Sequence, residues 1–163
     1  MGSSNYLRRM NGLFSKNFVR LLANLWPPFL AAGIGIDSIG DGYRDMQVSM
    51  TLRWYNRNYV GTHFGGSMYA MVDPFYMLML IQNLGRDYIV WDKAAFIDFK
   101  KPGTGRITAK FHLSKEFIEE VRLKSHQSGK YVFDIPVEIK NEAGEVVAEV
   151  KKTLYVRYKL FKG

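Results

Sequence analysis

The chain contains no cysteine among its 163 residues. This absence excludes disulfide bonds, thiolate metal sites and cysteine nucleophiles. Long apolar runs are missing too: the longest, Phe75 to Ile81, is far shorter than the roughly 20 residues that cross a bilayer. With 47% apolar residues, we expect a soluble, cytoplasmic globular protein with a sizeable core.

Acidic residues are absent before Asp37, although that segment carries Arg8, Arg9, Lys16 and Arg20. The formal net charge of the whole chain is +8. A basic protein attracts phosphate-bearing partners such as nucleic acid, anionic lipid or a nucleotide-tailed cofactor such as coenzyme A. No nucleic-acid motif is visible and the basic residues form no dense run, so we expect no nucleic-acid partner.

Histidine is scarce, with three in the chain. Neither His112 nor His126 has the spacing to carboxylates that a metal site requires, so we expect no metal and no cofactor. Serine catalysis has no support either, because Gly66-Ser67-Met68 lacks the nucleophile-elbow sequence.

The N-terminal segment predicts an amphipathic helix over residues 6–25, ended by Trp26-Pro27-Pro28. Such a helix either packs on the main domain or on a partner subunit, or it lies on a membrane surface. A basic, acid-free segment also fits a targeting peptide, but no small-residue cleavage site follows it. We divide the chain into a helical extension, residues 1–41, and a main domain, residues 42–163.

Alternating polar and apolar residues dominate the main domain. The pattern predicts strands over residues 44–54, 88–99, 107–113, 131–139 and 146–156, with a short helix capped by Ser114. On the last strand, Lys152 is the exception among inward-facing apolar residues. Between the first two strands, an apolar helix runs from Gly66 to about Leu84, and Pro74 should kink it. The order predicts an α+β protein with one antiparallel sheet wrapped around one helix.

The start of this helix is the candidate site. Gly65 and Gly66 permit close approach to backbone N–H groups that have no acceptor within a helix. One carboxylate, Asp73, stands in an otherwise apolar run, where its burial is costly unless it is used. The combination indicates an oxyanion site beside a general base.

The segment also resembles the hot-dog-fold thioesterases of the phenylacetic-acid (PaaI) type. Their pattern is Asn, Gly, then His-Gly-Gly opening the central helix, then Asp eight residues after the first Gly of the pair. Asn58, Gly61, Gly65, Gly66 and Asp73 match it. The family His falls at Phe64, while His63 stands one residue early.

A closer resemblance, from about Gly42 to Arg157, is to a thioesterase-like branch, the DUF4442 group. That branch carries a Phe-Gly-Gly variant and a downstream Trp-Asp-Lys, here Trp91-Asp92-Lys93. The resemblance implies the hot-dog fold and a site shared between two subunits of a homodimer or dimer of dimers.

Several roles remain open at this stage. Asp73 is expected as base or nucleophile, or else it binds a structural partner such as Arg53 or Lys93. Asn58 orients a water or carbonyl, or forms a turn. The resemblance assigns carbonyl polarisation to the Gly66 N–H.

Three neighbouring positions, Gly65, His63 and Phe64, are expected to contact substrate. His63 either replaces the displaced family His or faces solvent. Lys100 and Lys101 either contact coenzyme A phosphates or form a solvated strand end.

Two functions follow. The first is hydrolysis of an acyl-CoA or carrier-linked acyl thioester, with Asp73, Asn58 and Gly66 as catalytic residues. The second is a non-catalytic hot-dog module that binds acyl-CoA, fatty acyl chains or lipid, with Phe64 filling the place of the catalytic His.

Overall fold

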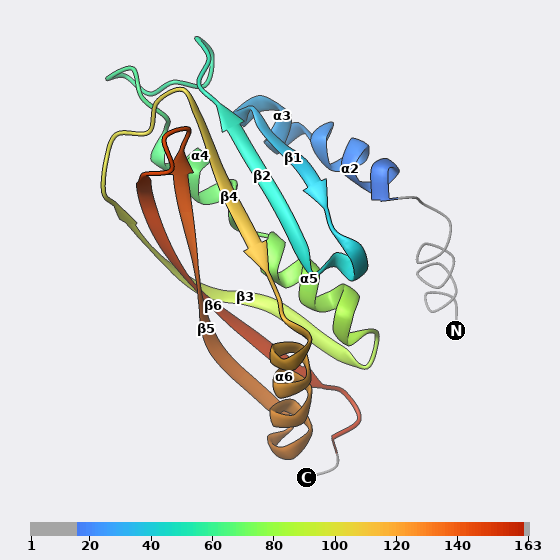
Figure 1. The fold of residues 1–163 in the computed structure, drawn as a ribbon. Helices are drawn as coiled ribbons and strands as arrows, with labels where there is room; N and C mark the ends of the chain where they lie inside the picture. The colour runs from blue at the N-terminus through green and yellow to red at the C-terminus, as the bar shows by residue number, and fades with distance from the viewer. Residues whose placement is uncertain (1–15, 162–163) are drawn as a thin grey trace.

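The computed structural model describes residues 16–161 (Figure 1). Its strands form one antiparallel sheet and are β1 (Ile34–Ile39), β2 (Asp45–Thr51), β3 (Tyr88–Phe99), β4 (Arg106–His112), β5 (Lys130–Asn141) and β6 (Val146–Tyr158). Its helices are α2 (Lys16–Asn24), α3 (Pro27–Ala32), the 3-10 turn η1 (Asp41–Tyr43), α4 (Gly65–Ala70), α5 (Phe75–Leu84) and α6 (Lys115–Ser128).

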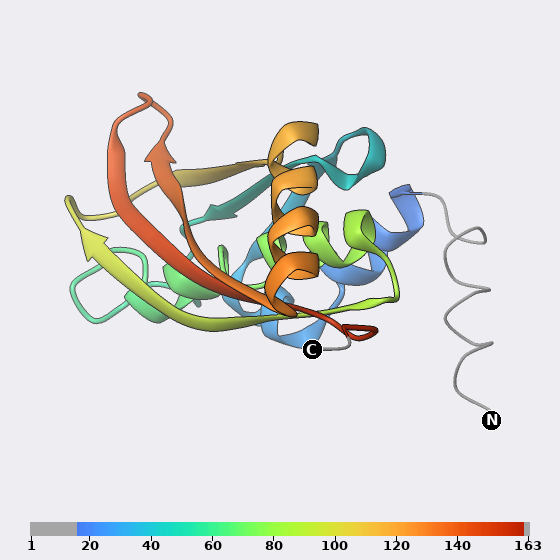
Figure 2. The same ribbon diagram turned by 90° about the horizontal axis from the view of Figure 1, so that it is seen from below.

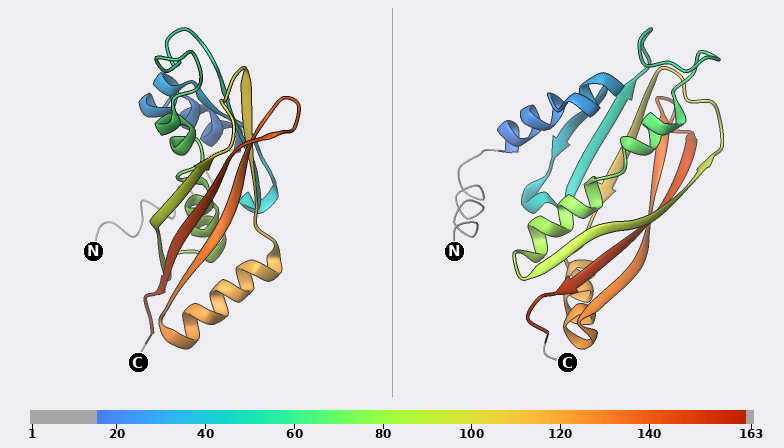
Figure 3. Two further views of the ribbon diagram at one scale, coloured as in Figure 1. Left: turned by 90° about the vertical axis from the view of Figure 1, so that its left-hand side faces the viewer. Right: turned by 180° about the vertical axis from the view of Figure 1, so that it is seen from behind.

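The sheet has the order β1-β2-β4-β5-β6-β3, which leaves β1 and β3 at its two edges. It curls around α5, as the view from below shows (Figure 2). Helices α4 and α5 lie against one face, and α2 and α3 run beside β1 (Figure 3, right). This is the α+β hot-dog architecture predicted from the sequence.

The predicted central helix is broken rather than merely kinked. Helix α4 ends at Ala70 and α5 begins at Phe75, so Met71 to Pro74 form a turn between them. Pro74 is the N-cap of α5. A proline has no N–H to continue the hydrogen-bond ladder and its ring clashes with the preceding turn, so the helix restarts there. The break places Asp73 outside both helices.

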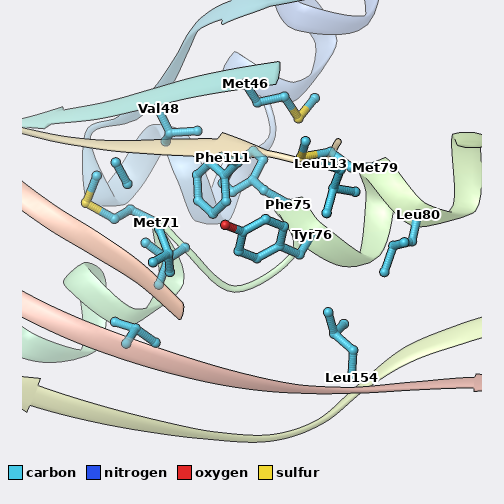
Figure 4. Packing of buried hydrophobic residues seen from close by; sticks show 14 of the residues in the cluster. Met46, Val48, Met71, Phe75, Tyr76, Met79, Leu80, Phe111, Leu113 and Leu154 are labelled. Atoms are coloured by element: carbon cyan, nitrogen blue, oxygen red, sulfur yellow. The ribbon is translucent and has the colours of Figure 1, made fainter. Parts of the chain in front are cut away.

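Aromatic side chains of α5 fill the space beneath the sheet. Phe75 and Tyr76 each place their ring 5.1 Å from the ring of Phe111 on β4 (Figure 4). Phe29 of α3 reaches the same core, 5.8 Å from Phe75. The alternating strand residues Met46, Val48 and Met50, with Leu154 from β6, are buried around them.

The N-terminal prediction is corrected in two respects. The glycine-rich stretch expected to connect the helix to the sheet contains β1, which pairs with β2. The sheet therefore begins at Ile34, before the proposed boundary at residue 42. Pro27 and Pro28 end α2 as expected but also open α3, because proline suits the first turn of a helix. Residues 6–15 of the predicted helix lie outside the described residues.

Pairing along the sheet is uneven. Strands β5 and β6 pair from Lys130 to Lys140, whereas β4 and β5 pair only over Ile107–Ala109 and Ile139–Asn141. Helix α6 connects the diverging ends of β4 and β5. Ser114 caps it as predicted, accepting a hydrogen bond of 3.0 Å from the N–H of Phe117.

A candidate active site around Asp73

The Asp73 carboxylate is held from one side. Its Oδ1 accepts a hydrogen bond of 2.7 Å from the Tyr69 hydroxyl and one of 2.6 Å from the Lys152 Nζ. Tyr69 lies one turn earlier, on α4, and Lys152 lies on β6. The Asp73 side chain is 43% exposed, although Lys152 is completely buried. Lys152 therefore lies inside the protein, Tyr69 is partly buried, and the carboxylate reaches the surface.

Lys152 bridges two carboxylates. Its Nζ lies 3.1 Å from Asp92 Oδ1 on β3. Asp92 pairs with Leu154 across the β3–β6 ladder, and the register shifts between Asp92 and Ala94. A buried ammonium group needs such partners, because an isolated charge inside a protein is strongly disfavoured.

The Trp-Asp-Lys motif has a structural reason. The Trp91 ring stacks on Tyr155 of β6 at 4.3 Å between centroids. Asp92, next along β3, forms the ion pair with Lys152. Lys93 occupies the register shift. The motif thus supplies the second carboxylate of this cluster.

Burial and charge act in opposite directions on this cluster. For Lys152, burial acts to lower the pKa, but the hydrogen bond to Asp73 and the charge of Asp92 outweigh it and raise the pKa overall. Burial raises the pKa of Asp92, with Lys152 opposing and Asp73 adding to the rise. Burial and the hydrogen bond to Asp73 raise the pKa of Tyr69. Tyr69 is therefore a neutral donor and Lys152 a permanent cation near neutral pH.

The two oxygens of Asp73 differ in their surroundings. Both hydrogen bonds go to Oδ1, and no residue among 16–161 donates a hydrogen bond to Oδ2. A carboxylate fixed through one oxygen presents the other in a defined direction. That is the arrangement a general base or a carboxylate nucleophile needs.

The first two residues of α4 are glycines because aromatic rings occupy the space that a Cβ atom would need. A Cβ on Gly66 would lie 2.5 Å from the Phe64 ring, and one on Gly65 would lie 2.9 Å from the Phe99 ring. Phe64 itself is the exposed N-cap residue of α4. The ring at the family His position therefore covers the beginning of the helix.

Asn58 holds its own loop together. Its Nδ2 donates to Thr62 Oγ1 at 2.9 Å and to the His63 carbonyl at 3.3 Å. Its Oδ1 accepts from the N–H groups of Val60 and Thr62. The turn interpretation of Asn58 thus describes its contacts within one chain, and its catalytic role stays a prediction.

His63 is buried, with 3% of its surface exposed, so the expectation that it faces solvent is wrong. Its ring Nε2 lies 3.0 Å from the Gly105 carbonyl, and its backbone N–H donates to the Gly103 carbonyl at 2.9 Å. Burial lowers the pKa of His63, with the bond to Gly105 opposing. The ring is therefore neutral, and since a carbonyl only accepts, Nε2 carries the proton.

A groove of about 390 Å³ lies beside the start of α4. It brings together predicted residues from the loop, the helix and the β3–β4 connection: Asn58, His63, Gly65, Lys100 and Lys101. Asp73 is not among the described residues that line it. Lys100 pairs with Asp98 and Glu149, and Lys101 pairs with Glu145.

Three residues of the Asp73 cluster escaped prediction as site residues: Tyr69, Asp92 and Lys152. The sequence did carry a signal, since Lys152 interrupts an inward apolar face. Asp73 does bind a structural partner, but that partner is Lys152 and not Arg53 or Lys93. Within residues 16–161, no group of three or more His, Cys, Asp and Glu side chains is arranged to hold a metal ion.

Comparison with known proteins places the chain in a family. The model of the domain of unknown function DUF4442 matches residues 15–156. The chain belongs to the DUF4442 family. A search of curated proteins found no matching sequence.

Solved structures agree on the fold. A Pseudomonas aeruginosa protein of unknown function, PA5026, described as a probable thioesterase, has 20% identity and a TM-score of 0.76. The alignment covers 88% of this chain and 96% of that one. Thioesterase HI1161 from Haemophilus influenzae has 17% identity and a TM-score of 0.63, over 90% and 93% of the two chains.

The E. coli PaaI protein of the phenylacetic acid degradation operon is similar as well. It has 20% identity and a TM-score of 0.57, over 84% of this chain and 88% of that one. This DUF4442 protein therefore has the hot-dog fold of thioesterase-like proteins. At these identities, the likeness extends to the fold alone.

Proposed function

We propose that this DUF4442 protein hydrolyses acyl thioesters and that Asp73 carries the reaction. The observation that carries the proposal is the one-sided anchoring of Asp73. Oδ1 is fixed by Tyr69 and Lys152, and the carboxylate is partly exposed. The thioesterase-like fold and the spacing from Gly65 to Asp73 support the same function.

In the proposed reaction, Asp73 accepts a proton from water, and the resulting hydroxide attacks the thioester carbonyl carbon. The carbon–sulfur bond breaks, and the thiolate leaves and takes up a proton. The Gly66 N–H would stabilise the negative charge on the carbonyl oxygen, as the family pattern implies. Direct attack by Asp73 would instead form a mixed anhydride, which water then hydrolyses.

The substrate class we propose is an acyl group on coenzyme A or on a carrier protein. Thioesters of this kind carry phosphate groups, which suit a chain of net charge +8. Lys100 and Lys101 lie in the groove beside α4, so we assign them to the phosphate-bearing end of the substrate. Their ion pairs are exposed, and exposed pairs exchange partners at little cost.

The active unit is proposed to be a dimer. Within one chain, Asp73 does not line the groove at Asn58. In a dimer, the groove of one subunit would face the Asp73 carboxylate of the other. Strand β3 is an edge strand with the exposed aromatic side chains Trp91, Phe96 and Phe99, and natural proteins cover such edges. Sedimentation velocity should show a dimer or a larger even assembly at micromolar concentration. A stable monomer would contradict this part of the proposal.

A second function has its own support. The Phe64 ring covers Gly66, where the family pattern has a polarising His. A protein with an apolar ring at that place would bind an acyl chain without hydrolysing the thioester.

Hydrolysis of acyl-CoA substrates of increasing chain length, measured by thiol release, separates the two functions. The wild type should turn over at least one substrate, and Asp73→Ala should not. Asp87→Ala, which removes an exposed carboxylate after α5, is the matched control and should behave as wild type. Binding of acyl-CoA without turnover in the wild type would favour the second function.

A further inference from the structure

Helix α2 docks on the sheet through a mainly polar side, from which Ala23 also packs against the core. Asn24 pairs with the edge strand β1: its Oδ1 accepts from the Ile36 N–H at 2.7 Å, and its Nδ2 donates to the Ile36 carbonyl at 3.3 Å. Arg20 donates to the Asp37 carbonyl at 2.8 Å, and Lys16 pairs with Asp41. Lys16, Arg20 and Asn24 are four residues apart and thus share one face.

The opposite side of the segment is apolar and points away from the protein. We call its exposed side chains the outer stripe: Leu21, Leu22, Leu25, Trp26 and Leu30. Each is 52% to 56% exposed, and no described residue of α2 is buried. An amphipathic helix in a globular protein normally turns its apolar face to the core. In α2 the large apolar side chains point away from the core instead. The outer stripe is therefore exposed to the surroundings of the protein.

The position of the outer stripe separates it from the proposed dimer contact. Helices α2 and α3 run beside β1 (Figure 3), and β3 forms the other edge of the sheet. A dimer joined through β3 would therefore leave both copies of the outer stripe uncovered. A contact between two outer stripes would bring together two chains that each carry a net charge of +8. Like charges of this kind oppose association.

From its exposure and the positive net charge of the chain we infer that the outer stripe docks on an anionic lipid surface. Leucine side chains enter the boundary between headgroups and acyl chains, and tryptophan favours the same depth. Lys16 and Arg20 face the protein, but the net charge of +8 attracts the whole chain to negatively charged headgroups. The polar side chains of α2, which would otherwise need water, already bond to β1 and to Asp41 of η1. Among residues 16–161, no helix is long and apolar enough to span a bilayer.

The test is flotation of the full-length protein with vesicles of phosphatidylcholine alone and of phosphatidylcholine with phosphatidylglycerol. The protein should float with the anionic vesicles and less so at high salt. The double variant Leu21→Glu/Leu25→Glu should weaken binding by on the order of 100-fold, since two leucines no longer enter the lipid. Leu123→Glu replaces a leucine of matched exposure, 58%, on α6 and should bind as wild type.

Several results would overturn this inference. They are no binding to anionic vesicles, equal binding by the double variant, or equal loss of binding by Leu123→Glu. If the double variant instead sediments as a smaller assembly while neither protein binds vesicles, a second copy covers the outer stripe. Thermal melting of all variants, which should match the wild type because the side chains are exposed, shows that the fold is intact.

Discussion

Asp73 and His63 are both titratable residues predicted at the site, but they lie in opposite environments in the structure. Asp73 is anchored through one oxygen and reaches the surface. His63 is enclosed, with its Nε2 on the Gly105 carbonyl and its pKa lowered by burial. A residue that does chemistry must be held firmly but remain accessible, whereas a residue that only holds a loop can be buried completely.

The largest expected effect separates the two residues by activity. Asp73→Asn keeps the shape of the side chain but cannot accept a proton as a carboxylate does, so turnover should fall by about 100- to 10,000-fold. His63→Ala should cost much less, because the ring contacts the Gly105 carbonyl and not the reacting atoms. Steady-state kinetics on the best acyl-CoA substrate would measure both. Wild-type turnover by Asp73→Asn would refute the mechanism.

Next in size is the contribution of Lys152 to stability. Lys152→Met removes the cation between Asp73 and Asp92 and should lower the free energy of unfolding by about 3–5 kcal/mol, because buried charge is left uncompensated. Adding Asp92→Asn should recover part of the loss. Lys151→Met, the neighbour on β6 with an exposed side chain, should cost far less. Urea denaturation gives these values, and an equal loss in the two single variants would contradict the buried-pair account.

A smaller effect, and this time an increase in turnover, is expected from Phe64→His, which restores the family's His-Gly-Gly. A donor near the thioester oxygen should raise turnover on the order of tenfold if the geometry of the site otherwise suits catalysis. Phe64→Leu controls for removal of the ring. If neither the wild type nor Phe64→His hydrolyses any acyl-CoA, the binding function becomes the better conclusion.

The smallest expected effect is the pH dependence that His63 causes. Its folded-state pKa lies below the ordinary 6.5, so the unfolded chain binds more protons in acid. The contribution of His63 to stability is therefore complete above about pH 6.5 and is lost as pH falls through the folded-state pKa. The difference in melting temperature between the wild type and His63→Gln should therefore be smallest in acid. An acid-side slope in His63→Gln equal to that of the wild type would contradict this prediction.

The fold could be predicted well because its signals are local. Alternating residues gave β2 to β6, Ser114 and Gly129 bounded α6, and Pro74 marked the break beside Asp73. Strand β1 was missed because Gly33, Gly35 and Gly40 make it look like a linker. Glycine has a low propensity for β-strands, but the pairing of β1 with β2 stabilises the strand.

The site was predictable only in part because its groups are distant in sequence. Asp73 stood out as a lone acid in an apolar helix. Lys152 stood out as an inward-facing lysine on an apolar strand face, but nothing local joins positions 73 and 152. Their contact depends on β6 lying near the end of α4, which only the assembled sheet determines. The orientation of α2 stayed open for a related reason, since an amphipathic pattern does not say which face meets the protein.

The short pairing between β4 and β5 has a consequence for motion. The sheet consists of two well-paired halves, β1-β2-β4 and β5-β6-β3, joined by the Ile107–Ala109 segment. Local opening follows the path with the fewest hydrogen bonds to break. Amide hydrogen exchange should therefore report two cooperative units that separate along this seam. Lys152, the partner of Asp73, and Asp92, which also pairs with Lys152, lie on β6 and β3 of one unit. The ion pairs of this cluster should therefore persist while the seam opens.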